Sequence, residues 1–528
     1  MRVIIIMDLI KGNRKDLKAL ALKRLASNTV CAYLAKNTET RDKGEFRRAS
    51  NVPLQIFLCR PLRHRPVSVL KGFPMGTGSV SADAFIQAHP ELQFVDLLIP
   101  DINGIVRGKR VDPSALAKVF ERGIALPASI FALNIQGTTV EETGLGLDIG
   151  EADRVCLPVE DTLTMEPWQK RPTAQLLLSM YELDRDTPFF ADPRVVLQNI
   201  VKRFDELGLT PVAAYELEFY LIDQENLAGR PQPPKSPISG KRPAGTQAYS
   251  IDDLDEYAEF LADVLDAARE QALPADALVA ESAPGQFEVN LHYVDDAVRA
   301  CDHATLLKRL IKNVAYDHEM DTTFMAKPYH NQAGSGMHVH VSLVDGDGRN
   351  IFAGDAEQPN DRLRWALGGL AVTMNDAMAL FCPNINSYRR FSPEYYVPSA
   401  PTWGVDNRTA SLRLPGGDPD ALRIEHRVAG ADANAYLLMA AVLAGIHYGI
   451  TNKIEPPPMT VGNAHEQHEA SLVNNLRDAL RELSQSAVMT DYLGKEFLDV
   501  FVACKEHELT EFEMTISDLE YLWYLHTV

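Results

Sequence analysis

Apolar and polar residues alternate most regularly along Met337–Leu343, directly after the glycine-rich segment Gly334–Gly336. An alternation with a period of two predicts a β-strand. On such a strand His338, His340 and Ser342 share one face, while the valines and leucine between them pack on the other. The glycines let the backbone approach a ligand closely. Because paired histidines also occur on ordinary half-buried strands, this pattern alone does not define a site.

Similar patterns predict elements on both sides of this strand. Phe94–Pro100 and Ile105–Val111 flank an Asn-Gly pair, which predicts a hairpin, and a helix over Pro113–Glu121 follows with Asp112 as its N-cap. Further along, the periodicity predicts a strand over Pro211–Ile222 and helices over residues 193–207, 252–271 (starting at Ser250 or Asp252) and 302–317. Residues 225–246 are rich in Pro and Gly, which predicts a surface loop. The tail over 464–528 is helical by pattern. Strands thus alternate with helices through most of the chain.

The chain of 528 residues is long enough for two or three domains. Residues 1–74 differ from the rest, because they hold 16 Lys and Arg against 5 Asp and Glu, a net of +11, whereas the whole chain carries −20. Their periodicity is also poor after Leu25. We expect either a disordered basic arm or a translation start placed upstream of a natural start at Met75. Residues 75–175 are then a small α+β domain and residues 176–528 a large C-terminal domain.

Composition narrows the class of protein. The chain is 46% hydrophobic and 23% charged, as in soluble globular proteins, and its charge of −20 argues against nucleic acids and anionic membranes as partners. No apolar run approaches the roughly 18–20 residues that span a bilayer. The six cysteines form no C-x-x-C pair, which predicts a reduced cytoplasmic protein without a disulfide framework or structural zinc: Cys31, Cys59, Cys156, Cys301, Cys382 and Cys504.

Several glutamates occupy positions from which they can converge with His338. Glu216 and Glu218 are two apart on a predicted strand and so share a face, while Glu281 and Glu288 bracket a Pro-Gly-Gln turn. A further acid, Glu425, lies between two arginines. Oxygen-rich sites with an occasional imidazole suit Mg²⁺ or Mn²⁺ rather than zinc. The acids therefore predict a site for divalent metals.

Arginines gather in the same part of the chain: Arg390, Arg408, Arg413, Arg423 and Arg427. A guanidinium group binds carboxylates and phosphates through two parallel hydrogen bonds. Divalent metals together with arginines are what phosphoryl transfer requires, since its catalysis consists largely of positioning and charge neutralisation.

Six segments, taken in order, resemble the glutamine synthetase family over about residues 80–528: Pro211–Phe219, Glu281–Glu288, Gly334–Ser342, Asn386–Arg390, Asn407–Pro415 and Arg423–Arg427. The resemblance implies an α+β fold with a small β-grasp-like N-terminal domain and a large catalytic domain built on an antiparallel sheet. It also implies a homododecamer of two hexameric rings with active sites shared between neighbouring subunits.

The same resemblance implies a role for each matching residue. Glu218, Glu281 and Glu288 would bind the metal on the glutamate side, and Glu216, His338 and Glu425 the metal on the ATP phosphates. His340, Ser342, Arg413 and Arg423 match nucleotide contacts, Gly334, Arg390 and Arg427 match contacts to glutamate, and Arg408 matches the arginine that stabilises the transferring phosphoryl group. The family reaction phosphorylates the γ-carboxylate of glutamate with ATP, and an amine then attacks the acyl phosphate.

Two acids that handle ammonium in ammonia-using family members have no counterpart here. Residues 123–131 contain no acid where those members carry an aspartate, and Tyr396 stands where their flap carries a glutamate. Glu394 is the acid remaining in that flap. In an extended flap Glu394 and Tyr396 share a face, so we expect Glu394 to accept the proton of the amine and Tyr396 to pack on its alkyl chain.

This pattern resembles the γ-glutamylpolyamine synthetases, which join glutamate to putrescine or longer polyamines. An apolar pocket without acids suits an alkyl chain better than a strongly hydrated ammonium ion. Three alternatives remain open: a γ-glutamyl ligase for ethanolamine, an alkylamine or an aromatic amine; a glutamine synthetase with relocated acids; and a non-catalytic relative, which would have no reason to keep all six metal ligands.

Overall fold

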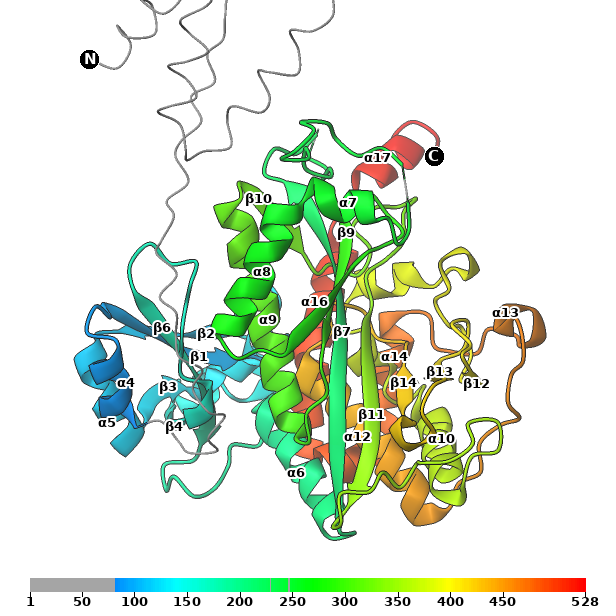
Figure 1. Ribbon diagram of the computed structural model, residues 1–528, viewed down its shortest axis with the longest axis horizontal. Coiled ribbons are helices and arrows are strands. Elements are labelled where there is room, and N and C mark those ends of the chain that lie inside the picture. Colours follow the sequence, from blue (N-terminus) through cyan, green and yellow to red (C-terminus); the bar gives the residue numbers. More distant parts are fainter. Residues whose placement is uncertain (1–80, 228, 246) are drawn as a thin grey trace, which may run out of the picture. The chain divides into compact units, whose positions relative to one another are not determined.

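The computed structural model describes residues 81–528 except 228 and 246, so the predicted basic arm, Cys31 and Cys59 lie outside the described residues. The described residues all belong to one compact unit. Within the described part, two mostly antiparallel β-sheets are combined with helices that lie between and after their strands in sequence (Figure 1). This arrangement confirms the α+β class.

The first sheet has the strand order β2-β1-β6-β4-β3, with β5 paired to β6. Its strands are β1 (Phe94–Pro100), β2 (Val106–Val111), β3 (Ile124–Pro127), β4 (Asp153–Pro158), β5 (Thr164–Met165) and β6 (Thr173–Tyr181). The predicted hairpin is confirmed, and the buried Asp101 carboxylate holds its turn by accepting hydrogen bonds from the backbone of Asn103 and Ile105, each 2.9 Å. Because β6 continues to Tyr181, the expected domain boundary at residue 175 falls inside a strand of this sheet.

The second sheet has the order β12-β13-β14-β11-β7-β9-β8, with β10 paired to β7. Its strands are β7 (Leu209–Asp223), β8 (Ala275–Ala280), β9 (Gln286–Leu291), β10 (Met320–Thr323), β11 (Met337–Asp345), β12 (Trp403–Val405), β13 (Leu412–Leu414) and β14 (Ile424–His426). All its pairs are antiparallel except β12 with β13. The two long strands predicted from alternation, β7 and β11, are neighbours at its centre.

Helices flank these sheets, and most of those before the C-terminal tail lie between successive strands along the chain. They include α4 (Ala82–Ala88), α5 (Leu116–Arg122), α6 (Pro193–Asp205), α7 (Ile251–Glu256), α8 (Ala258–Glu270), α9 (Ala297–Asp317), α10 (Asp361–Thr373), α11 (Met378–Phe381) and α12 (Ala435–Asn452). Asp112 caps the start of the predicted helix as expected, although Pro113–Ala115 form a 3-10 turn ahead of α5. The helix predicted over 252–271 is interrupted at Tyr257, whose hydroxyl donates to the Pro234 carbonyl at 3.0 Å. Asp296 caps α9 five residues earlier than expected.

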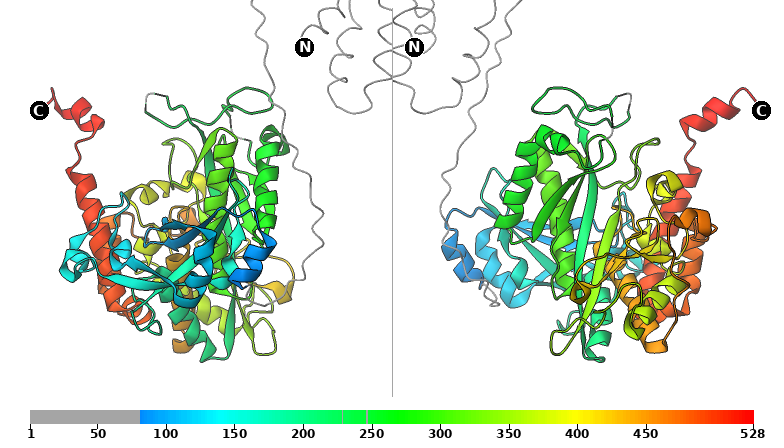
Figure 2. Two further views of the ribbon diagram at one scale, coloured as in Figure 1. Left: turned by 90° about the vertical axis from the view of Figure 1, so that its left-hand side faces the viewer. Right: turned by 45° about the vertical axis from the view of Figure 1, so that its right-hand side comes forward.

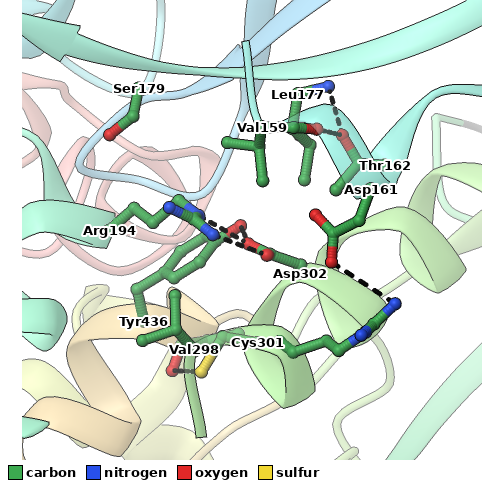
Figure 3. Close-up of polar contacts among 12 residues, drawn as sticks. Val159, Asp161, Thr162, Leu177, Ser179, Arg194, Val298, Cys301, Asp302 and Tyr436 are labelled. Atoms are coloured by element: carbon green, nitrogen blue, oxygen red, sulfur yellow. Dashed lines mark hydrogen bonds and ion pairs between the residues drawn. The ribbon is translucent and has the colours of Figure 1, made fainter. Parts of the chain in front are cut away.

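A buried polar network joins three of these helices to one another and to β7, and Figure 3 labels its helix residues Arg194, Cys301, Asp302 and Tyr436. Arg194 of α6 pairs with Asp302 of α9 at 3.0 Å, and the Tyr436 hydroxyl of α12 donates to the same carboxylate at 2.7 Å. Tyr215 of β7 lies 3.2 Å from the Cys301 sulfur and donates to the Ala435 carbonyl at 2.8 Å. Since every charge here has a partner, the network fixes the positions of the helices without leaving a buried group unsatisfied.

Helix α12 is long and apolar enough to cross a membrane by length and composition. The expectation that no apolar run approaches the length of a membrane span is therefore wrong. In the fold, 83% of that stretch is buried inside the protein. Helix α10 packs closely on α12, and glycine at position 369 makes this possible. An added Cβ at Gly369 would lie only 2.1 Å from the Gly445 carbonyl oxygen. The stretch is therefore a helix of the core, surrounded by protein on nearly all sides.

The predicted helical tail is confirmed. It comprises α13 (Ala464–Gln467), α14 (Leu476–Gln485), α15 (Ala487–Leu493), α16 (Lys495–Met514) and α17 (Asp518–Tyr524). Figure 2 shows α17 extending beyond α16, away from the sheets. Its aromatic residues Tyr521, Trp523 and Tyr524 are all exposed by more than half.

Candidate active site

The four adjacent strands β9, β7, β11 and β14 bring five of the six predicted metal ligands to one face of the second sheet, and the sixth, Glu281, lies in the turn between β8 and β9. Three directly opposed pairs do this: Glu218 with Glu288, Glu216 with His338, and His340 with Glu425. Opposed residues on neighbouring strands have their Cβ atoms about 5 Å apart and point to the same side. The antiparallel register therefore assembles residues that lie far apart in sequence.

Glu216 is the centre of this cluster. One of its carboxylate oxygens lies 3.1 Å from His338 Nδ1 and the other 2.9 Å from His340 Nε2. Arg423 Nε donates to His340 Nδ1 at 3.2 Å, so the proton of His340 lies on Nε2 and points to Glu216. Glu218 accepts a hydrogen bond from the Gly336 amide at 2.8 Å.

Glu425 is buried between two of the predicted arginines. Arg413 Nη1 lies 2.7 Å from one of its oxygens, and Arg427 Nη1 bonds to the other. Burial alone would raise the pKa of Glu425, but Arg427 and the two histidines of β11 lower it to about 2. The pKa of Glu216 is likewise held below its usual range, because hydrogen bonds from both histidines outweigh its burial. Both groups are therefore ionised at neutral pH.

Glu288 and Glu281 show the opposite behaviour. Burial and the neighbouring carboxylates raise the pKa of Glu288 to about 10, and burial together with Glu218 raises that of Glu281 to about 7. The site thus gathers more negative charge than its own arginines and histidines neutralise. A hard divalent cation fits such a set of carboxylates and imidazoles.

Among the described residues there are two groups of potential ligand atoms, and within each group the atoms lie within 4.8 Å of one another. One comprises Glu216, Glu288 and His338, and the other Glu216, His340 and Glu425. Both contain residues that the sequence predicted as ligands, but Glu216 belongs to both groups and His340, predicted as a nucleotide contact, joins one of them. The division into two sets of three that the resemblance implies therefore stays a prediction.

The predicted glutamate contacts lie beside the cluster. Arg390 is 3% exposed, and its Nη1 donates to the Val428 carbonyl at 3.0 Å. An added Cβ at Gly334 would lie 2.5 Å from Arg390 Cγ, and one at Gly336 would lie 3.1 Å from Arg390 Nη2. The glycines ahead of β11 therefore allow the Arg390 side chain to approach the strand. Ser342 lies on the same face of β11 as His340, two residues farther along.

Arg408, Glu394 and Tyr396 line one cavity of about 820 Å³. The predicted extended flap is wrong, because Pro393–Tyr395 form a 3-10 turn and Tyr396 has a φ of 55°. Proline fixes its own φ near the helical value and so favours such a turn. The side chains of Glu394 and Tyr396 nevertheless line the same cavity. The shared location was expected, but the 3-10 turn produces it instead of an extended segment.

Sequence reasoning missed Lys327. Its side chain is 7% exposed and its ammonium lies 4.1 Å from the centre of the Tyr395 ring and donates to the Gln332 carbonyl. Its backbone amide donates to Asn386 Oδ1 at 2.8 Å. Lys327 thus joins the flap to the segment that precedes β11. The sequence around Lys327 has no periodicity that would have pointed to a site. The one available signal was its position directly before Pro328 and shortly before the glycine-rich segment Gly334–Gly336.

Comparison with known proteins is consistent with this geometry. Residues 190–524 match the family described as glutamine synthetase, catalytic domain. Gamma-glutamylputrescine synthetase PuuA of Escherichia coli (strain K12) is 44% identical over 442 residues, which are 84% of this chain and 93% of that protein. The glutamine synthetase of Thermotoga maritima is 33% identical, over 82% of this chain and 97% of that protein. A solved structure of GmaS without ligand has a TM-score of 0.73 and 26% identity, covering 85% of this chain and all of that chain.

The chain belongs to the glutamine synthetase family. Enzymes of this family depend on ATP and use divalent metals, which agrees with the acid and arginine clusters of the second sheet. The fold expected from the six segments is confirmed by the solved relative.

Proposed function

We propose that this enzyme joins the γ-carboxyl group of glutamate to one nitrogen of a polyamine such as putrescine, with ATP as co-substrate and γ-glutamyl phosphate as the intermediate. It is an ATP-dependent glutamate–amine ligase. The observation that carries the proposal is the combination of a complete acid–histidine cluster with a flap that carries Tyr396 in place of an acid. The 44% identical relative is named for putrescine, whereas the glutamine synthetase is 33% identical.

The residues of the second sheet divide the chemistry between them. Glu216, Glu218, Glu281, Glu288, His338 and Glu425 would hold Mg²⁺ or Mn²⁺, which neutralises phosphate charge during phosphoryl transfer. Arg413 and Arg423, with His340 and Ser342, would position ATP, while Arg390, Arg427 and the backbone at Gly334 would hold glutamate. Arg408 would stabilise the phosphoryl group as it moves to the γ-carboxylate.

The flap supplies what the amine needs. A primary alkyl amine has a pKa of about 10 and arrives protonated at neutral pH. Glu394, which shares a cavity with Arg408 and Tyr396, would accept that proton before the nitrogen attacks. Tyr396 is 63% exposed and offers its ring to the part of the alkyl chain next to the reacting nitrogen. Residues 124–132, which form β3 and the 3-10 turn after it, offer no acid for an ammonium ion.

Assembly and location follow from the same reasoning. The exposed aromatic residues of α17 support a homo-oligomer, because contiguous exposed apolar surface marks contact sites. We propose the dodecamer of two hexameric rings implied by the family. The cysteines Cys156, Cys301, Cys382 and Cys504 are free and buried, which supports a cytoplasmic location.

The test is ATP- and glutamate-dependent phosphate release with Mg²⁺ across a panel of amines. The panel contains putrescine, spermidine, ethanolamine, isopropylamine, an aromatic amine and ammonium. We expect putrescine or spermidine to give the highest kcat/KM. A highest value for ethanolamine, isopropylamine or the aromatic amine would reassign the acceptor, and a highest value for ammonium would make the protein a glutamine synthetase.

A further inference from the structure

A separate cavity of about 240 Å³ lies beside Glu281, between β9, α7 and the loop that precedes α7. The side chains that matter for its chemistry are Ser236, Asp253, Glu256, Tyr257, Glu281 and Gln286. Glu281 therefore belongs both to the acid cluster of the second sheet and to the wall of this cavity.

Two acids of α7 face this cavity. The Glu256 carboxylate accepts a hydrogen bond from the Ser236 hydroxyl, and hydrogen bonds from Ser236 and Ser239 hold its pKa below the usual range. No hydrogen bond or ion pair within residues 81–528, as far as they are described, reaches the Asp253 carboxylate. The cavity thus presents one anchored carboxylate and one carboxylate that still lacks a cation.

The cations of the lining compensate this charge only in part, because Lys241 helps to lower the pKa of Glu256 while no ion pair among the described residues joins either lining cation to Asp253. Arg242 is engaged elsewhere, because its Nη2 lies 2.8 Å from Asp223 Oδ2 and its Nη1 donates to the Pro233 carbonyl. Lys241 is exposed to solvent, where its ammonium is well hydrated. A positively charged ligand group would therefore be attracted to Asp253 and Glu256.

Gln286 gives independent evidence for a ligand that donates hydrogen bonds. Its side chain is 2% exposed and its Nε2 donates to the Gly334 carbonyl at 3.0 Å, but its Oε1 has no partner among the described residues. A buried amide oxygen without a donor is destabilising and rare in folded proteins. A ligand with N–H groups in the cavity would satisfy it.

Between these polar groups the lining is apolar. Tyr257 and Phe287 are almost fully buried, and their rings meet edge to face with centres 5.4 Å apart. Ala280 and Ala283 add small apolar surface. Such a surface between two polar ends suits a short alkyl chain with a nitrogen at each end.

We propose that this cavity selects α,ω-diamines: the nitrogen that is acylated lies near Glu281, and the second ammonium binds Asp253 and Glu256. The inference rests on the proposed function and names the feature of the amine that is recognised. The second ammonium makes and breaks no covalent bond, so its role is in binding and shows in KM more than in kcat.

The test compares putrescine with n-butylamine, which has the same four-carbon chain but one nitrogen. We expect the unaltered enzyme to prefer putrescine, and Asp253→Asn to lower kcat/KM for putrescine about tenfold, the order expected for a partly buried charge-assisted contact. Its kcat/KM for n-butylamine should change less than twofold. Asp252→Asn is the matched control, since Asp252 is exposed on the same helix and does not line the cavity.

A second variant guards against an effect on folding. Asp253→Lys places an ammonium in the cavity, so it should lose putrescine activity further while n-butylamine activity and the thermal midpoint are retained. Equal losses with both amines, or no loss with either, would overturn the inference. An unaltered enzyme that uses n-butylamine as well as putrescine would overturn it too and leave the ligase function standing. Absence of phosphate release with every alkyl amine would refute the proposed function itself.

Discussion

The two faces of strands β7 and β11 are made of alternate residues from the same segments and have opposite properties. On one face Tyr215, Leu217 and Phe219 are fully buried, and Tyr215 is bonded to the start of α12. On the other face Glu216 and Glu218 gather with the histidines of β11. Because adjacent residues point to opposite sides of a sheet, one face can stabilise the fold while the other concentrates charge. Substitutions one residue apart should therefore have separate consequences.

The largest expected effect is at Glu216. Glu216→Gln keeps the shape of the side chain but removes the charge that is shared by both groups of potential metal ligands. We expect ligation to fall by roughly a thousandfold, the upper range for loss of one key electrostatic contact, with an unchanged thermal midpoint. Phosphate release, Mn²⁺ binding by equilibrium dialysis and thermal unfolding measure the three quantities. Near-normal activity with normal Mn²⁺ binding would contradict the assignment.

The neighbouring residue gives the complementary result. Leu217→Ala removes a fully buried side chain from the opposite face. We expect the free energy of unfolding to fall by about 2–5 kcal/mol, while the activity per folded molecule stays close to that of the unaltered enzyme. Urea titration and active-site-normalised assays separate the two. A selective loss of activity at unchanged stability would show that the two faces are not independent.

The third prediction concerns Glu394, which lies in the flap and not on the charged face of β7 and β11. Glu394→Gln should lower kcat/KM for putrescine by roughly a hundredfold, the low end for loss of a general base. Hydroxylamine is already neutral at neutral pH, so its kcat/KM should change little. Glu357→Gln is the control, because Glu357 lines the same cavity. Equal effects on both amines would leave Glu394 without a role in proton transfer.

The smallest effect concerns a histidine on α9, the helix that packs against β7. Burial lowers the pKa of His303 from an ordinary 6.5 to about 4, although Asp302 opposes the shift. Between these values the unfolded chain binds a proton that the folded chain does not, so stability falls as the pH drops from 6.5 towards 4.

We expect His303→Gln to remove about 3 kcal/mol of this acid sensitivity. The thermal midpoint as a function of pH, compared with His292→Gln at an exposed position, measures it. Parallel pH profiles for the unaltered protein and His303→Gln would rule out this contribution.

The sequence was most informative where a single physical rule decided the structure. Alternation predicted β7 and β11, and with them the shared face of Glu216, Glu218, His338 and His340. The Asn-Gly pair predicted the β1–β2 hairpin. Period and turn chemistry are local, so they can be read without knowing the fold. The interruption of the predicted helix 252–271 at Tyr257 was missed. The Tyr257 hydroxyl donates to the carbonyl of Pro234, 23 residues earlier in the chain, and such a contact leaves no local pattern.

The active site likewise has some features that are local in sequence and others that depend on the fold. The residue types predicted a metal and phosphate site, but only strand register brings Glu288 opposite Glu218 and Glu425 opposite His340. Lys327 and Asp253 gave no periodic signal, since they act from segments whose positions are set by tertiary contacts. A two-residue spacing places Glu394 and Tyr396 on one face only in an extended segment, whereas Pro393 begins a turn.

Competition between two acceptors tests the central claim most directly. The enzyme is incubated with glutamate, ATP and Mg²⁺ and with equal concentrations of putrescine and ammonium, and the products are identified by mass spectrometry. Because residues 123–131 carry no acid and Tyr396 stands where ammonia-using members carry the flap glutamate, we expect γ-glutamylputrescine in large excess over glutamine. Glutamine as the main product would contradict the account.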